Sequence, residues 1–163
     1  MKKFFSLVVI LVLVFSFTGC GDDKKVDQTN NIEQKKVETP VVETDDLVIA
    51  NKVREYVKEH YSNTTVDDIT VNPHLGTEKA DDYVVLVRLT WSQKNSAKTT
   101  KEMLDMYSSD MAARMYKDLP EIQELAVFWT VPYLNNGNAK ISFERAGNGM
   151  KYTDKVFDKN FNQ

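Results

Sequence analysis

Several segments of the chain alternate regularly between apolar and polar positions. The clearest are residues 83–91, with apolar Tyr83 and Val85 to Trp91 at every second place, and residues 125–133. Side chains of a strand point alternately to opposite faces, so this period of two predicts two strands that each bury one face. Asn136-Gly137 then predicts a hairpin into a strand at 139–146. Residues 69–73 predict a shorter strand that Pro73 ends or places at an edge.

Two further segments have apolar residues at the spacing of a helix. The first follows Asp45 and Asp46, which suit the first turn of a helix, and the second follows Thr99 and Glu102, which have the spacing of a capping box. Pro120 ends the second helix. The stripes consist of Ile49, Val53, Tyr56, Val57 and His60 in the first helix and Leu104, Tyr107, Met111, Met115 and Leu119 in the second.

The order of these elements, αββαββ, indicates an α+β fold. Strands joined by hairpins, with helices set apart, favour an antiparallel sheet of about four strands with both helices on one face, a two-layer sandwich. Residues 150–163 predict a tail with scattered apolar anchors, which is expected to contain a short final helix. Two interpretations of the second sheet face stay open: either it is uncovered, or the tail covers it with Phe157 and Phe161.

The N-terminus carries a different hydrophobic pattern, a nearly continuous apolar run from Phe4 to Phe17 behind Lys2 and Lys3. As a helix this run reaches about 21 Å at 1.5 Å per residue, whereas the bilayer core is about 30 Å thick. A permanent membrane span is therefore not expected. The basic flank, the short apolar run and the small residues that follow predict a signal peptide at residues 1–19.

The run ends in Phe17-Thr18-Gly19-Cys20, which resembles the lipobox of bacterial lipoproteins. The resemblance covers about twenty residues and concerns targeting alone; it departs from the usual pattern at Phe17, where Leu, Val or Ile is common. It implies that Cys20 receives a diacylglyceryl group and that cleavage occurs just before it. The alternative is an ordinary signal peptide that happens to contain a cysteine. Because Cys20 is the chain's single cysteine, no disulfide is expected to support the fold.

Composition divides the remaining chain into a linker and one domain. Residues 20–46 contain no aromatic side chain and many polar ones, so we expect a lipid anchor followed by a disordered linker. Residues 47–163 suit a single compact domain. Without residues 1–19 the 21 basic groups fall by 2, to 19 against 24 acidic groups, a formal charge of −5. A net negative charge does not attract nucleic acid, so no nucleic-acid partner is expected.

The sequence contains no recognisable catalytic motif, and it predicts no cofactor, no metal and no catalytic residue. His60 and His74 are expected to lie far apart, and zinc needs three or four converging ligands. The pairs Asp67-Asp68 and Asp81-Asp82 lack the loop spacing of a calcium site and are interpreted as turn residues. Carboxylates at Glu121, Glu124 and Glu144 can in principle form the pair that sugar hydrolysis requires, but sequence supplies no separation.

The reverse side of the two long strands is the candidate partner surface. If these strands are neighbours, aromatic, guanidinium and hydroxyl groups share one uncovered face, a mixture found in recognition surfaces. The candidate residues are Leu86, Arg88, Thr90, Phe128 and Thr130.

Together these features predict a lipoprotein on the extracytoplasmic face of a bacterial membrane, held through lipidated Cys20. Its domain is expected to act as a non-enzymatic module that binds an envelope protein, peptide or polymer. The first alternative is an envelope hydrolase or transferase whose carboxylates converge only in the folded chain. The second is a structural envelope protein without a defined partner.

Overall fold

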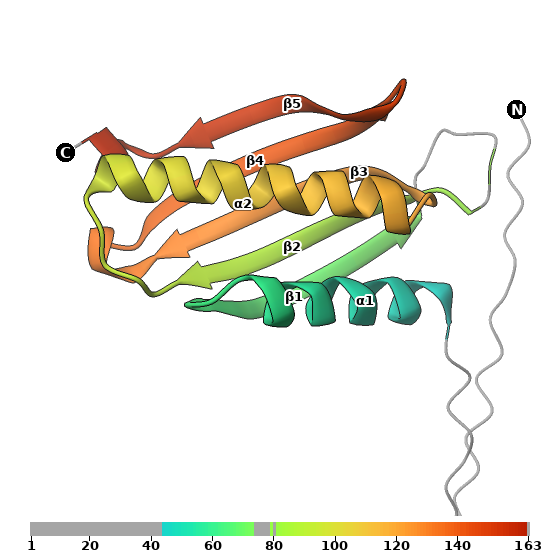
Figure 1. The fold of residues 1–163 in the computed structure, drawn as a ribbon, viewed down its shortest axis with the longest axis horizontal. Helices are drawn as coiled ribbons and strands as arrows, with labels where there is room; N and C mark the ends of the chain where they lie inside the picture. Colours follow the sequence, from blue (N-terminus) through green and yellow to red (C-terminus); the bar gives the residue numbers. More distant parts are fainter. Residues whose placement is uncertain (1–43, 74–78, 80, 163) are drawn as a thin grey trace, which may run out of the picture. The chain divides into compact units, whose positions relative to one another are not determined.

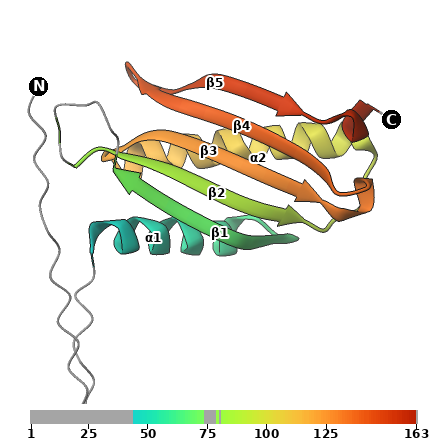
Figure 2. The same ribbon diagram turned by 180° about the vertical axis from the view of Figure 1, so that it is seen from behind.

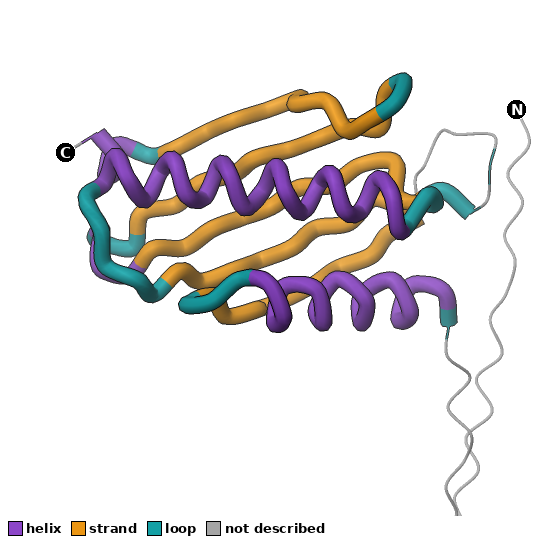
Figure 3. Tube along the Cα trace, in the orientation of Figure 1, coloured by secondary structure: helices purple, strands orange, loops and turns teal. Residues whose placement is uncertain are grey.

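The protein folds as an α+β domain in a computed structural model that describes residues 44–73, 79 and 81–162. The elements are α1 (Asp45–His60), β1 (Thr64–Pro73), β2 (Tyr83–Trp91), α2 (Ala97–Asp118), β3 (Ile122–Val131), η1 (Pro132–Leu134), β4 (Gly137–Ala146), β5 (Gly149–Phe157) and η2 (Lys159–Asn162). Both helices lie on the same side of one sheet (Figures 1 and 3). The predicted fold class is confirmed, but the sheet differs from the prediction in two respects.

The first difference is strand direction. The sheet has the order β1-β2-β3-β4-β5, and its central pair, β2 and β3, is parallel, whereas the other neighbours are antiparallel. The prediction of an all-antiparallel sheet was therefore wrong. Helix α2 is 22 residues long, enough to carry the chain back along the sheet so that β3 starts beside the beginning of β2.

The second difference is a fifth strand, since Gly149–Phe157 forms the edge strand β5 where a tail was expected. Its alternation is interrupted because the pairing shifts by one residue: Ser142 pairs with Asp154, but Phe143 pairs with Tyr152. This bulge, together with the exposure of most of the strand, removes the regular pattern that marks buried strands. Only a short 3-10 turn, η2, follows it.

The core lies between the sheet and the two helices. Val87, Leu125 and Val127 in the central strands are fully buried, and Trp129 donates a hydrogen bond from Nε1 to Ser108 Oγ of α2 at 2.9 Å. The core cluster runs from Ile49 to Phe161 within the compact unit Pro40–Gln163. A unit that contains its own hydrophobic core has what it needs to fold alone.

The helices follow the predicted stripes, but their ends differ. Helix α2 begins at Ala97, because Ser96 Oγ accepts a hydrogen bond from the Thr99 backbone N–H at 3.1 Å. The expected capping box at Thr99 is therefore wrong by one turn. In α1, Ile49, Val53 and Val57 are buried as predicted, whereas His60 is exposed and stacks on Tyr56.

The face of the sheet opposite the helices, called the open face below, has no helix or strand over it in the described part of the chain (Figure 2). The tail does not cover it. Phe161 is 3% exposed and belongs to the core, and Phe157 lies under Lys101 of α2, with 4.9 Å between Nζ and the ring centroid. Both phenylalanines thus point to the helix side, and of the two interpretations left open by the sequence the uncovered face is the one found.

A buried tyrosine in the core makes the stability of the domain depend on pH in the alkaline range. Tyr61 is 3% exposed, and its hydroxyl, with one proton to donate, lies 2.8 Å from the Tyr107 carbonyl oxygen and 3.1 Å from Asp110 Oδ2. Burial, reinforced by nearby Tyr56 and Asp110, raises the pKa of Tyr61 well above its usual range. Its contribution to stability is fully present below the unfolded pKa of about 10 and is lost as the pH rises beyond it, because only the unfolded chain ionises readily.

We therefore expect Tyr61→Phe to flatten the alkaline side of the stability profile. Urea unfolding between about pH 8.5 and 11.5 should show a smaller loss of unfolding free energy for the variant than for the wild type. Near neutral pH the variant should be less stable by about 1 kcal/mol, because the hydroxyl's hydrogen bonds are lost. Equal slopes above pH 10 in both proteins would contradict the assignment.

Candidate functional site

All five residues predicted for the partner surface lie on the open face. The register pairs Arg88 with Phe128, Leu86 with Ala126 and Thr90 with Thr130 across β2 and β3. Because alternate residues of a strand share a face, the buried positions between them face the helices instead. The structure thus brings Leu86, Arg88, Thr90, Phe128 and Thr130 together on two central strands.

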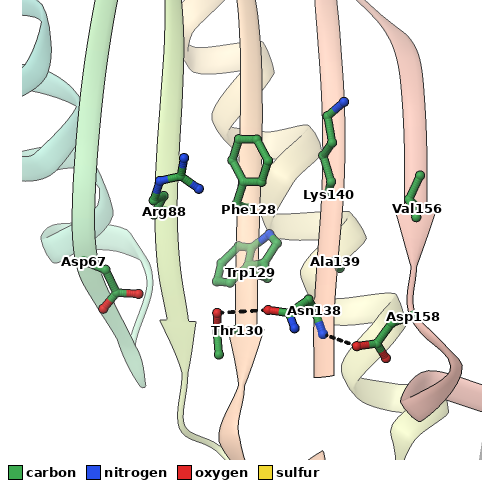
Figure 4. A pocket seen from close by; sticks show the side chains of 10 residues that line it. All are labelled: Asp67, Arg88, Phe128, Trp129, Thr130, Asn138, Ala139, Lys140, Val156 and Asp158. Atoms are coloured by element: carbon green, nitrogen blue, oxygen red, sulfur yellow. Dashed lines mark hydrogen bonds between the residues drawn. The ribbon is translucent and has the colours of Figure 1, made fainter. Parts of the chain in front are cut away.

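The register extends these positions into rows that cross the whole sheet. The row that contains Arg88 is named the Arg88 row, and it consists of Asp68, Arg88, Phe128, Lys140 and Val156, one residue from each strand. A hollow of about 350 Å³ lies over the Arg88, Phe128, Lys140 and Val156 part of this row and over the adjacent Thr130 and Asn138. Figure 4 shows Arg88, Phe128 and Lys140 side by side on their three strands.

An aromatic ring and a guanidinium form the centre of the hollow. The Cζ atom of Arg88 lies 4.7 Å from the centroid of the Phe128 ring, within the range of a cation–π contact. The Arg88 side chain remains 50% exposed. Phe128 is half-buried on a face without a covering layer. The pair therefore presents both an apolar surface and hydrogen-bond donors to solvent.

A bulge in β1 brings two carboxylates to the open face. The pairing shifts between Val66 and Asp68, so Asp67 is the additional residue. Asp67 accepts a hydrogen bond from Thr90 Oγ1 at 2.7 Å, and Asp68 accepts one from Thr70 Oγ1 at 2.9 Å and lies 3.9 Å from Arg88 Nε. The interpretation of this pair as turn residues was wrong, because the bulge lets two adjacent side chains reach partners on the same face.

The other rim of the hollow is formed by residues that sequence reasoning missed. Lys140 forms a 3.0 Å ion pair with Asp154, and Asp158 accepts a hydrogen bond from the Asn138 backbone N–H at 2.6 Å. Val156 is 53% exposed. Asn138 and Lys140 alternate with the predicted inward positions of the 139–146 strand, a signal that was present in the sequence. Val156 and Asp158 had no comparable signal, because β5 was not recognised.

The carboxylates considered for catalysis separate into two places. Glu124 and Glu144 lie directly opposite each other on β3 and β4, on the open face, whereas Glu121 lines a different hollow beside Asp45 and Lys52 of α1. Glu144 is exposed, and Glu124 lines a second hollow that also includes Leu86 and Phe128. The structure thus brings one pair together, on an open surface that does not exclude water as a hydrolytic cleft does.

The described residues contain no group of three His, Cys, Asp or Glu side chains that could hold a metal ion. His60 Nδ1 lies 3.0 Å from the Tyr56 carbonyl, so this imidazole is used locally at the end of α1. Asp81 lies in a turn as expected, and Asp82 accepts a hydrogen bond from Gln123 Nε2 at 3.0 Å. His74 and Cys20 lie outside the described residues.

The described helices include none that is both long and apolar enough to cross a bilayer. Comparisons of the chain with protein-family models, with curated proteins and with solved structures gave no significant match.

Proposed function

We propose that this protein is a lipid-anchored module of the bacterial cell envelope and that its open sheet face binds a partner. Cys20 is the expected point of attachment to the membrane, on the extracytoplasmic side. The partner is a protein, peptide or polymer of the envelope. In this proposal the domain works by binding and carries out no reaction.

The observation that supports binding is the Arg88–Phe128 pair at the centre of the open face. The centroid of the half-buried Phe128 ring lies 4.7 Å from Arg88 Cζ. Aromatic residues and arginine are enriched in protein interfaces, and arginine is among the residue types that contribute most of the binding energy. They lie in a shallow hollow of about 350 Å³ rather than on a convex surface. No described helix or strand lies over this face of the sheet (Figure 2).

The proposal can be tested by photo-crosslinking of the full chain in the cells that produce it. A photoreactive amino acid at position 128 should give a discrete crosslinked product with an envelope component. The same amino acid at Met106, which is 56% exposed on α2, is the matched control and should not give that product. Identical products from both positions, or none from position 128, would count against a binding role for this face.

Arg88→Ala and Phe128→Leu provide an independent check on the same experiment, with the photoreactive group moved to Thr130. Both variants should reduce the crosslink several-fold, because interface residues of this kind often contribute more than 1 kcal/mol. Their circular dichroism and unfolding midpoints should stay close to the wild type, since Arg88 is half exposed and leucine preserves most of the apolar volume at position 128. Loss of folding in Arg88→Ala would refute its assignment as a surface residue.

A further inference from the structure

The chemistry of the partner can be narrowed by asking which polar groups around the hollow still have hydrogen-bonding capacity. This step rests on the proposed binding role of the open face. In the described part of the chain, the polar contact of Arg88 is the 3.9 Å approach of its Nε to Asp68 Oδ2. Neither terminal nitrogen, Nη1 or Nη2, makes a hydrogen bond there. The planar fork is held over Phe128 with its two outer nitrogens available.

Unlike the terminal nitrogens of Arg88, the carboxylates near it already have partners, because each accepts a hydrogen bond from the protein. Asp67 accepts from Thr90, Asp154 from Lys140, and Asp158 from the backbone N–H groups of Asn138 and Asn160. Asp68 accepts from Thr70. These acids act mainly as structural acceptors that hold the strands and the η2 turn, so Arg88 offers the largest set of unused donors in the hollow.

One apolar group lies directly beside those donors, and a second lies farther along the same row. Phe128 is the next residue of the Arg88 row, and Val156, 53% exposed, lies two strands further along the same row. A ligand group that accepts two hydrogen bonds from Arg88 would therefore have an apolar neighbour over Phe128 and Val156.

The surrounding acids exclude ligands that carry many negative charges. Asp67 and Asp158 line the hollow with the cations Arg88 and Lys140, and each cation has a further carboxylate close by, Asp68 and Asp154 respectively, so a polyanion would be repelled as it approached. A single carboxylate is different, because two parallel N–H donors from one guanidinium can hold it at short range. The unused donors of Arg88, rather than the overall charge around the hollow, thus favour a single carboxylate, and the surrounding acids require the rest of the ligand to be uncharged or zwitterionic.

We propose that the open face binds the carboxylate end of a peptide whose last side chain is apolar. The terminal carboxylate accepts hydrogen bonds from Nη1 and Nη2 of Arg88, and the apolar side chain packs on Phe128 and Val156. Peptide backbone groups can then reach the hydroxyl of Thr130 and the amide of Asn138 at the edge of the same hollow. Thr130 Oγ1 already donates a 3.3 Å hydrogen bond to Asn138 Oδ1.

The test compares two small probes that differ in one group, N-acetyl-alanyl-leucine and its C-terminal amide. Binding is followed by nitrogen-15 NMR of the unit 40–163, which contains its own core. We expect the acid to bind about tenfold more tightly than the amide, the effect of one good charge-assisted contact. The largest shift changes should fall on residues 88, 128, 140 and 156.

Variants at position 88 distinguish the paired hydrogen bonds of the guanidinium from the effect of its positive charge alone. Arg88→Gln should abolish the preference for the acid, and Arg88→Lys should keep only part of it, because an ammonium cannot form two parallel bonds. The matched control is Arg114→Gln, since Arg114 also lies over an aromatic ring, with 5.8 Å from Cζ to the Tyr56 centroid, but on the helix side. Arg114→Gln should bind both probes as the wild type does.

Three results would overturn this inference: equal affinity for acid and amide, shift changes centred away from the Arg88 row, or no binding of the acid at about 10 mM, a concentration about tenfold above a Kd of about 1 mM. The proposed function is judged separately by the crosslink from position 128. If that crosslink forms while the acid shows no advantage, the face binds a partner without a carboxylate contact. If neither is seen, both proposals fail.

Discussion

Replacing Cys20 by serine should abolish lipidation of the protein and its stable attachment to the membrane. One acyl chain gives marginal membrane binding, whereas two chains hold a protein firmly, and a diacylglyceryl group supplies two. Cells grown with radioactive palmitate should therefore label the wild-type chain and leave the Cys20→Ser chain at background. Mass spectrometry of the wild-type product should find a chain that begins at position 20 and carries the lipid.

The control for this experiment is the folded domain itself. Cys20 lies far in sequence from the core, whose residues run from Ile49 to Phe161, so the serine variant should unfold at the same denaturant concentration as a wild-type sample without lipid. A bare thiol at position 20 in the native product, or a chain that still carries residues 1–19, would refute the anchor and with it the proposed location.

Replacing Arg145 by alanine should destabilise the domain by about 3 kcal/mol, the upper range for hydrogen bonds that involve a charged group. Arg145 donates from Nε to the Ile122 carbonyl at 2.9 Å, and from Nη1 and Nη2 to the carbonyls of Tyr116 and Leu119 at 3.1 Å each. Its Cζ also lies 4.4 Å from the centroid of the Tyr116 ring. One side chain thus satisfies acceptors at the end of α2 and at the start of β3.

The expected loss is large because alanine leaves three partly buried carbonyls without these donors and removes a cation from the negative end of a helix. Urea unfolding at neutral pH measures the change. The unfolding free energy of Arg145→Lys should lie between those of the wild type and Arg145→Ala, because lysine keeps the charge but cannot donate to all three carbonyls in the same geometry. Arg114→Ala, at an exposed position of α2, should change stability by less than about 0.5 kcal/mol. If Arg145→Ala lost no more unfolding free energy than Arg114→Ala, the stabilising role assigned to the Arg145 hydrogen bonds would be contradicted.

Regular alternation made β2 and β3 predictable, and the open-face residues followed from them. Leu89 and Trp129 had to point one way and Arg88 and Phe128 the other, because successive residues of a strand face opposite sides. Whether Arg88 and Phe128 meet is a different question, since it depends on which strands are neighbours and on their register. The α2 crossover and the parallel pairing of β2 with β3 decide it.

The two bulged edge strands, β1 and β5, show where the local sequence pattern no longer predicts the structure. Asp67-Asp68 looked like a turn, and residues 150–163 looked like a tail, because an additional residue in each edge strand interrupts the alternation. Asp67 and Val156 line the hollow all the same. Edge strands bury little surface, so the sequence is under weaker constraint there and its pattern is less distinctive.

The sequence by itself determined the class of the fold, the buried stripes of α1 and α2, the two central strands and which of their side chains face away from the helices. It also supplies the expectation of a lipid anchor at Cys20, because a short apolar run followed by a cysteine is a local pattern. The tertiary structure alone decided the parallel central pair, the fifth strand and the pairing of Arg88 with Phe128 beneath an open hollow. Local periodicity records which side of a segment is buried, whereas contacts between segments distant in the chain depend on how the elements pack together.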